Sequence, residues 1–215
     1  MILSRADLIR AKRLQLPPDF LELRLDALEA VVDEIESSIQ SLNVPLIVTA
    51  RHPREGGANR LSAACRAALL RRFLNRAAYV DIELRALREL RSIHRQARNQ
   101  NIGLIISFHD LEGTPSLARL RAKARAAVAA GADIFKVATR TDSREQLARL
   151  LHFFDQEHLD LPISAMGIGR FGRRARVELA RRGSALVYVS VGRSHIKGQL
   201  SIRQLRSALA AFKIK

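Results

Sequence analysis

Short apolar runs alternate with longer amphipathic stretches along the whole chain, and this alternation constrains the fold more than any other feature. The apolar runs have the length of strands and lie at 20–26, 45–51, 79–84, 102–109, 133–138, 162–166 and 185–191. The amphipathic stretches predict helices at about 28–41, 60–77, 85–99, 116–130, 143–157, 173–182 and 201–212. Such a succession of β–α units predicts a parallel sheet, because each strand must return through a crossover helix.

Polar side chains at the strand ends decide between an open doubly wound sheet and a closed barrel. Almost every predicted strand has a polar or charged residue at or near its end. These residues are Arg24, Asp26, Arg51, Glu83, His109, Lys136 and Ser190. A barrel gathers all its strand ends around one site, whereas an open sheet uses chiefly those beside its switch point. We therefore predict a single α/β domain over residues 1–215, a (β/α)8 TIM-type barrel. Because little more than Met1 to Leu3 precedes the segment 4–16, the first strand is expected to be shortened or missing.

Cysteine content and hydropathy indicate the compartment. The one cysteine, Cys65, cannot form an internal disulfide, which favours a reducing environment. No apolar run approaches the roughly 20 residues that span a bilayer, and the start of the chain lacks the apolar region of a signal peptide. The sequence predicts a soluble, cytoplasmic protein with no membrane partner.

The formal net charge of +16 allows two interpretations. A basic field attracts phosphate backbones, which would indicate nucleic-acid binding. However, the basic residues recur in nearly every predicted helix, and aromatic residues that could stack on bases make up 5% of the chain. This distribution favours a solvated surface over a nucleic-acid interface. A basic surface would also attract a substrate that carries a carboxylate.

The stretch Gly167-Ile-Gly169-Arg-Phe-Gly172 matches the GxGxxG spacing of dinucleotide-binding turns, since it follows a strand and precedes a helix. Its position argues against that function, because only one further strand follows and that strand ends without an acid to hold a ribose. We interpret the motif as a glycine-rich loop of an active site.

Lys136 is the one lysine of six that lies within a strand-like apolar run. Burying an ammonium is costly unless it is paired, and burial favours the neutral amine. A neutral amine can attack a carbonyl, so this position suits Schiff-base chemistry. A structural salt bridge is an equally good interpretation of the lysine alone. His109 favours catalysis, because it ends the preceding strand and can transfer protons near neutral pH.

Taken together, the motifs of these strand ends resemble the type I 3-dehydroquinate dehydratase family of the shikimate pathway, which removes water from 3-dehydroquinate. The similarity runs from about Phe20 to Leu209. The motifs occur in the family's order: Glu22-Leu-Arg24-Leu-Asp26, Thr49-Ala-Arg51, Glu55-Gly56-Gly57, Asp81-Ile-Glu83, Ser107-Phe-His109-Asp110 with Thr114-Pro115, Asp133-Ile-Phe-Lys136-Val-Ala138, Met166-Gly167 and Gly198-Gln199.

The resemblance implies a role for each site residue. Lys136 would form an imine with the substrate ketone, His109 would act as general base and then general acid, and Glu55 would hold His109. Arg174 would pair with the substrate carboxylate, with Arg173 and Arg176 as rivals. The remaining binding residues, which would hold hydroxyls and orient the ring, are Glu22, Arg24, Arg51 and Gln199. The resemblance implies no metal and no organic cofactor, and it is compatible with a homodimer.

Two departures from the family pattern concern the first strand and the closing loop. Where the family commonly has a serine followed by Ala-Pro-Gly-Gln, this chain has His195-Ile-Lys197-Gly198-Gln199. The serine hydroxyl is therefore absent at position 195. Another Schiff-base barrel, such as a class I aldolase, is the alternative enzyme, and a basic nucleic-acid-binding protein on a barrel scaffold is the alternative without catalysis.

Overall fold

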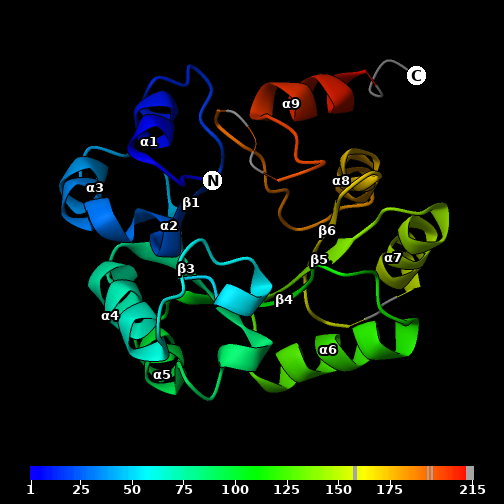
Figure 1. Ribbon diagram of the computed structural model, residues 1–215, viewed down its shortest axis with the longest axis horizontal. Coiled ribbons are helices and arrows are strands. Elements are labelled where there is room, and N and C mark those ends of the chain that lie inside the picture. The colour runs from blue at the N-terminus through cyan, green and yellow to red at the C-terminus, as the bar shows by residue number, and fades with distance from the viewer. Residues whose placement is uncertain (157–158, 193, 195, 212–215) are drawn as a thin grey trace. The chain divides into compact units, whose positions relative to one another are not determined.

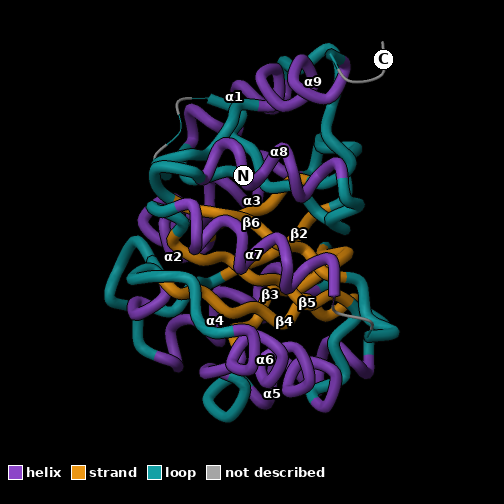
Figure 2. The backbone as a smooth tube through the Cα atoms, turned by 90° about the vertical axis from the view of Figure 1, so that its right-hand side faces the viewer, coloured by secondary structure: helices purple, strands orange, loops and turns teal. Residues whose placement is uncertain are grey.

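The computed structural model describes residues 1–156, 159–192, 194 and 196–211 (Figure 1). The chain divides into two compact units, residues 1–105 (unit 1) and residues 106–215 (unit 2), with the boundary inside one strand. Strands and helices alternate along the chain in both units, as Figure 2 shows. The single domain expected over residues 1–215 stays a prediction.

Unit 1 carries three complete strands and the start of a fourth. Its elements are α1 (Arg5–Lys12), β1 (Leu21–Arg24), α2 (Leu25–Leu28), η1 (Glu29–Val31), α3 (Val32–Ile39), β2 (Leu46–Thr49), η2 (Pro53–Glu55), α4 (Ala63–Leu74), β3 (Ala77–Glu83), η3 (Leu84–Ala86), α5 (Arg91–Asn99) and the start of β4 (Gly103–Asp110). The strands follow one another in chain order, and β1, β2 and β3 pair in parallel. Helix α4 packs on β2 and β3 and lies beside α5 (Figure 1).

The N-terminal residues confirm the shortened first strand. Ile2 forms a single parallel bridge with Leu23, in which its N–H donates to Glu22 O at 2.8 Å and its carbonyl accepts from Arg24 N at 3.1 Å. The Ile2 side chain is fully buried. Helix α1 follows at once, capped by the Ser4 hydroxyl, in a segment to which the apolar pattern had assigned no element.

Unit 2 contains the rest of β4, then α6 (Leu117–Ala129), β5 (Ile134–Arg140), α7 (Arg144–Gln156), β6 (Ile163–Ile168), α8 (Gly172–Arg181) and α9 (Ile202–Ala210). The strand order is β4-β5-β6, and β5 and β6 are parallel with Lys136 opposite Ser164. The helix starts predicted at Ser116 and at Ser143 are confirmed, because each hydroxyl accepts a hydrogen bond from a backbone N–H three residues later.

The seventh strand predicted at 185–191 forms only an isolated bridge, between Ser190 and Ser201. The segment starts beside β6, where the Ala185 N–H donates to Ile163 O at 2.9 Å. Side-chain hydroxyls then take the place of a strand ladder. Ser184 Oγ accepts from Ala165 N at 3.0 Å, and Ser164 Oγ donates to the carbonyl of residue 186 at 2.9 Å. The segment is tethered to β6, but it does not continue the parallel pairing.

Candidate active site

In unit 1, polar residues gather at the carboxyl ends of three adjacent strands. Arg24 lies opposite Thr49 in the β1–β2 register, and Thr49 lies opposite Asp81 in the β2–β3 register. Residues two apart on a strand face the same side, so Glu22 shares the face of Arg24. The Thr49 hydroxyl donates to Glu22 Oε1 at 3.0 Å, and the Glu22 side chain is buried.

Arg51 is held by two acids at the end of β3. Its Nη2 lies 2.8 Å from Asp81 Oδ2, and its Nη1 lies 3.1 Å from Glu83 Oε1. All three residues are at most 2% exposed. Burial by itself would lower the pKa of Arg51, but the charges of Asp81 and Glu83 outweigh it and raise that pKa well above its usual value. The guanidinium is therefore charged and rigidly oriented.

Asp26 organises the end of β1, and sequence reasoning assigned it no role of its own. Its carboxylate accepts from Arg24 Nε at 2.9 Å and from Arg24 Nη2 at 2.8 Å. It also accepts from the backbone N–H groups of Arg51 at 3.0 Å and Ala58 at 2.8 Å. Burial raises the pKa of Asp26, but the bonds and charge of Arg24, with the two backbone N–H groups, lower it overall. The sequence feature that could have indicated this role is the position of Asp26, two residues after Arg24 in the Glu22-Leu-Arg24-Leu-Asp26 motif.

Glu55 lies in η2, within the loop that Asp26 anchors. Its side chain is buried, and its Oε1 lies 3.7 Å from Arg85 Nε. Gly56 follows with a positive φ of 86°, a conformation that glycine adopts without strain. Its carbonyl accepts from Arg24 Nη2 at 3.1 Å, so the same arginine that binds Asp26 also orients this loop. The predicted pairing of Glu55 with His109 stays a prediction.

In unit 2, Lys136 occupies the middle of β5 and is 3% exposed, as its apolar run predicts. Its Nζ lies 3.7 Å from the centre of the Tyr188 ring. Tyr188 is buried too, and sequence reasoning missed it because it was assigned to an ordinary strand. Lys136 is thus a buried amine whose nitrogen lies over an aromatic face.

His109 lies on β4, the strand next to β5, and is half-buried. The turn after it is fixed by Asp110, whose Oδ1 accepts from the N–H groups of Glu112 at 3.1 Å and Gly113 at 3.0 Å. Thr114 then joins this turn to the end of β5, since its hydroxyl donates to the carbonyl of Arg140 at 2.8 Å. These contacts give the Ser-Phe-His-Asp and Thr-Pro motifs a local structural role.

The three candidate arginines for the substrate carboxylate differ in burial. Arg176 is 2% exposed, and its Nη1 donates to the Tyr188 carbonyl at 2.8 Å. Burial lowers the pKa of Arg176 to about 10. Arg173 and Arg174 lie in the first turn of α8 and are exposed. The Tyr188 carbonyl uses one donor of Arg176, and its buried Nε has no hydrogen-bond partner, so all three arginines stay candidates for an anion.

The glycines of the GxGxxG motif pack against the loop that leads to Gln199. Gly198 has a φ of 86°, and a Cβ on it would lie 2.7 Å from Gly169 O and 2.8 Å from Gly172 Cα. The Gly169 N–H donates to Lys197 O at 2.9 Å. The expected glycine-rich loop is thus a close approach of two backbone segments, which any side chain at these positions would push apart.

Gln199 is 9% exposed, and its Oε1 shares the proton of the Ser194 hydroxyl, 3.1 Å away, with the Ile196 carbonyl at 2.9 Å. Ser194 immediately precedes the position at which the family serine is absent, and its hydroxyl orients the glutamine. His195 lies outside the described residues. Lys197 is exposed, and its backbone carbonyl accepts a hydrogen bond from the Gly169 N–H.

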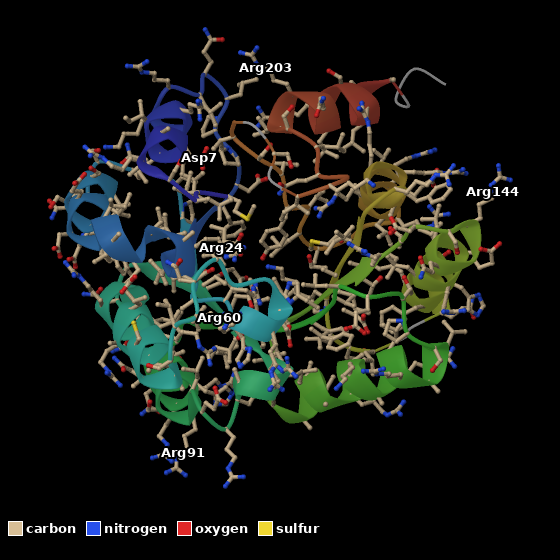
Figure 3. The ribbon with its side chains drawn as sticks, viewed as in Figure 1. Asp7, Arg24, Arg60, Arg91, Arg144 and Arg203 are labelled. Carbon is tan, nitrogen blue, oxygen red and sulfur yellow. The ribbon has the colours of Figure 1, made fainter. Side chains whose placement is uncertain are left out.

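Many basic side chains lie on the surfaces of both units, although Arg51 and Arg176 are buried. Arg91 on α5 and Arg144 on α7 are exposed and project away from the ribbon (Figure 3). Others form exposed ion pairs, such as Arg182 with Glu178 at 2.6 Å. Across the described part of the chain, no three His, Cys, Asp or Glu side chains gather so as to hold a metal ion. Within the same residues, no helix is long and apolar enough to cross a membrane.

Comparisons with known proteins agree on one family. The Type I 3-dehydroquinase family model matches residues 4–215. The chain is 33% identical over 192 residues to 3-dehydroquinate dehydratase of Methanothrix thermoacetophila, which covers 89% of this chain and 80% of the relative. The crystal structure of the Geobacillus kaustophilus 3-dehydroquinate dehydratase is 27% identical with a TM-score of 0.85, covering 99% of this chain and 86% of that one. The Aquifex aeolicus dehydratase structure is 28% identical with a TM-score of 0.80, covering 96% and 93%. These likenesses confirm the α/β barrel fold class.

Proposed function

The chain belongs to the type I 3-dehydroquinase family and is a hydro-lyase of 3-dehydroquinate, and on this premise we propose that its chemistry runs through an imine on Lys136. The observation that carries the proposal is the setting of this lysine. It is 3% exposed on β5, its neighbouring strand carries His109, and both residues lie in unit 2. A desolvated amine beside a proton-transfer group is suited to attack on a ketone.

The reaction proceeds through a balanced series of steps. The neutral Lys136 amine attacks the C3 ketone, and the carbinolamine loses water to form an iminium. The iminium withdraws electrons from the C2–H bond, and His109 accepts that proton as the bond electrons form an enamine. The C1 hydroxyl then leaves as water with the proton from the His109 imidazolium. Hydrolysis of the product iminium releases 3-dehydroshikimate and the free lysine.

The remaining residues bind and orient the substrate. Arg174 pairs with the carboxylate from the exposed first turn of α8, where a guanidinium can form two parallel hydrogen bonds. Glu22, Arg24, Arg51 and Gln199 bind hydroxyls. The rigid orientation of Arg51 by Asp81 and Glu83 supports this role, since a fixed donor loses little entropy on binding. Glu55 holds the His109 imidazole in one orientation.

The proposal is tested by trapping the imine. The chain is incubated with 3-dehydroquinate and sodium borohydride, which reduces a C=N bond to a stable amine, and the modified peptide is located by mass spectrometry. In parallel, the absorbance of the conjugated enone product measures turnover. We expect turnover by the wild type, a borohydride adduct on the peptide that contains Lys136, and loss of both in Lys136→Met.

Lys123→Met is the matched control. Lys123 is a half-buried lysine of the same unit, and its Nζ also lies over an aromatic ring, 5.1 Å from the centre of Phe108. This variant should keep both activity and adduct. An active enzyme that gives no adduct, or a Lys136→Met variant with normal turnover, would refute the imine mechanism. A folded wild type with no turnover would refute the assigned substrate.

The role of His109 is separated from that of the lysine by His109→Gln. We expect this variant to lose about 100- to 10,000-fold in kcat, the usual contribution of general acid–base catalysis. Borohydride should still trap substrate on Lys136, because imine formation precedes the proton transfer at C2. A variant that retains kcat would contradict the assignment of His109.

A further inference from the structure

Tyr188 makes a close contact to the proposed nucleophile. The centre of its ring lies 3.7 Å from Lys136 Nζ, which is within the range at which an aromatic face attracts a cation. Both side chains are buried, at 9% and 3% exposure. A cation–π contact shielded from water is stronger than an exposed one, because no solvent competes for the charge.

The position of the Tyr188 ring is determined by its backbone, which does not form part of a regular strand. Three contacts hold that backbone instead. Arg176 Nη1 donates to the Tyr188 carbonyl at 2.8 Å, and Ser164 Oγ donates to the Leu186 carbonyl at 2.9 Å. Ser190 forms the bridge to the residue that caps α9. Ser164 is also the register partner of Lys136 on β6, so one sheet position supports both the lysine and the ring segment.

Without this hydrogen bond, the buried charge of Arg176 would only destabilise the fold. Its guanidinium is 2% exposed, its Nε has no hydrogen-bond partner, and no ion pair to it occurs among the described residues. An unneutralised buried cation costs several kcal/mol. Its hydrogen bond to the Tyr188 carbonyl orients the segment that carries the ring.

We propose that Tyr188 is a positioning residue whose ring face holds the Lys136 nitrogen in place and stabilises the positive charge of its iminium. This inference rests on the proposed function. The nitrogen is neutral when it attacks the ketone and carries a positive charge once the iminium has formed. The ring face attracts the charged state, so it stabilises the iminium and the steps that lead to it more than the attacking amine. The phenol hydroxyl is not needed for this role.

Steady-state kinetics of Tyr188→Phe and Tyr188→Leu test the proposal. Phe keeps the ring face, so its kcat should remain within about twofold of wild type. Leu removes the face, and its kcat should fall about 30-fold, the rate equivalent of the ~2 kcal/mol of a desolvated cation–π contact. KM should change less than about threefold, because the ring binds the lysine rather than the substrate. A loss in Tyr188→Phe as large as that in Tyr188→Leu, or a Leu variant with wild-type kcat, would overturn the proposal.

Fluorinated phenylalanines at position 188 provide a test that keeps the shape of the side chain. Each added fluorine reduces the negative charge of the ring face while changing its volume little. We expect the logarithm of kcat to fall with each fluorine, and a flat series would overturn the electrostatic role of the ring. Because the volume is retained, these variants should unfold at the same temperature as Tyr188→Phe.

A chemical measurement separates this inference from the proposed function. Reductive methylation with formaldehyde and cyanoborohydride labels amines without any turnover, and mass spectrometry measures the rate at each lysine. In Tyr188→Leu, labelling of Lys136 should rise severalfold while that of Lys123 is unchanged, because the amine loses its ring cover. An unchanged Lys136 rate would overturn the contact even in an active enzyme. A selective rise in an enzyme without turnover would support the contact while the proposed function fails.

Discussion

Replacing Asp26 by asparagine perturbs the centre of the unit 1 site while preserving its shape. The carboxylate is fully buried and accepts four N–H groups, two from Arg24 and one each from the backbones of Arg51 and Ala58. In Asp26→Asn, one acceptor oxygen becomes an NH2 donor. Two of the four N–H groups then face a donor instead of an acceptor.

The magnitude follows from those lost contacts. A hydrogen bond to a charged group contributes about 1.5–3 kcal/mol, and two are removed. The Arg24 guanidinium also loses its bidentate counter-ion in a site where Arg24 itself is 8% exposed. Breaking one partner of a buried ion pair costs about 3–5 kcal/mol. We therefore expect Asp26→Asn to lower the free energy of unfolding by about 3–5 kcal/mol near neutral pH.

The effect should depend on pH with a defined sign. Burial raises the pKa of Asp26, but Arg24 and the two backbone donors together lower it below its ordinary value. The carboxylate therefore stabilises the fold fully above its unfolded pKa of about 3.9, and this stabilisation is lost as pH falls through the lower folded pKa. The difference between wild type and Asp26→Asn should stay constant from about pH 7 to pH 5 and shrink below about pH 4.

Urea unfolding followed by circular dichroism at a series of pH values measures this difference. Asp33→Asn is the matched control in the same unit, because Asp33 pairs with Arg72 while its side chain is 85% exposed. Exposed pairs contribute about 0–1 kcal/mol, so the control should stay close to wild type. The reasoning is refuted if Asp26→Asn costs no more than Asp33→Asn, or if its cost is unchanged down to about pH 3.

Three further substitutions test the unit 2 site. Gly198→Ala should raise KM and lower the unfolding temperature, because its φ of 86° and the nearby backbone leave no room for a methyl group; equal KM and unfolding temperature would contradict this. Ser194→Ala should raise KM about fivefold with kcat nearly unchanged, since about 1 kcal/mol from the orientation of Gln199 is lost. An unchanged KM in steady-state kinetics would contradict this role of the hydrogen bond. Arg176→Met removes a buried charge and should leave the free energy of unfolding in urea within about 1.5 kcal/mol of wild type while lowering kcat through Tyr188; unaltered kcat would argue against the backbone tether.

Much of the fold follows from local pattern. The alternation of apolar runs with amphipathic stretches predicts six strands that the structure contains and all seven helices after residue 28, some of them split into shorter pieces. These predictions succeed because buried parallel strands and amphipathic helices have distinct periodicities. The seventh predicted strand fails because hydrogen bonds from Ser184 and Ser164 replace its ladder, and no periodicity records where a hydroxyl will point.

Some residues of the site can be identified from the local sequence, and others only from contacts between distant segments. Lys136 can be identified from the sequence because a lysine within an apolar run is chemically conspicuous. Asp26 could be seen in its motif, but its four donors come from two strand ends and a loop. Among the three arginines at the start of α8, the sequence offers no distinction, and burial alone separates Arg176 from the exposed pair.

The sequence by itself determined the class of fold, the family and the identity of the proposed nucleophile, because each depends on residue order and local periodicity. The tertiary structure decided which groups surround that nucleophile. Tyr188 lies 52 positions along the chain from Lys136, yet its ring covers the amine nitrogen. Such a contact depends on how β5, β6 and the segment before α9 pack together, and packing between distant segments is a property of the whole fold rather than of any motif.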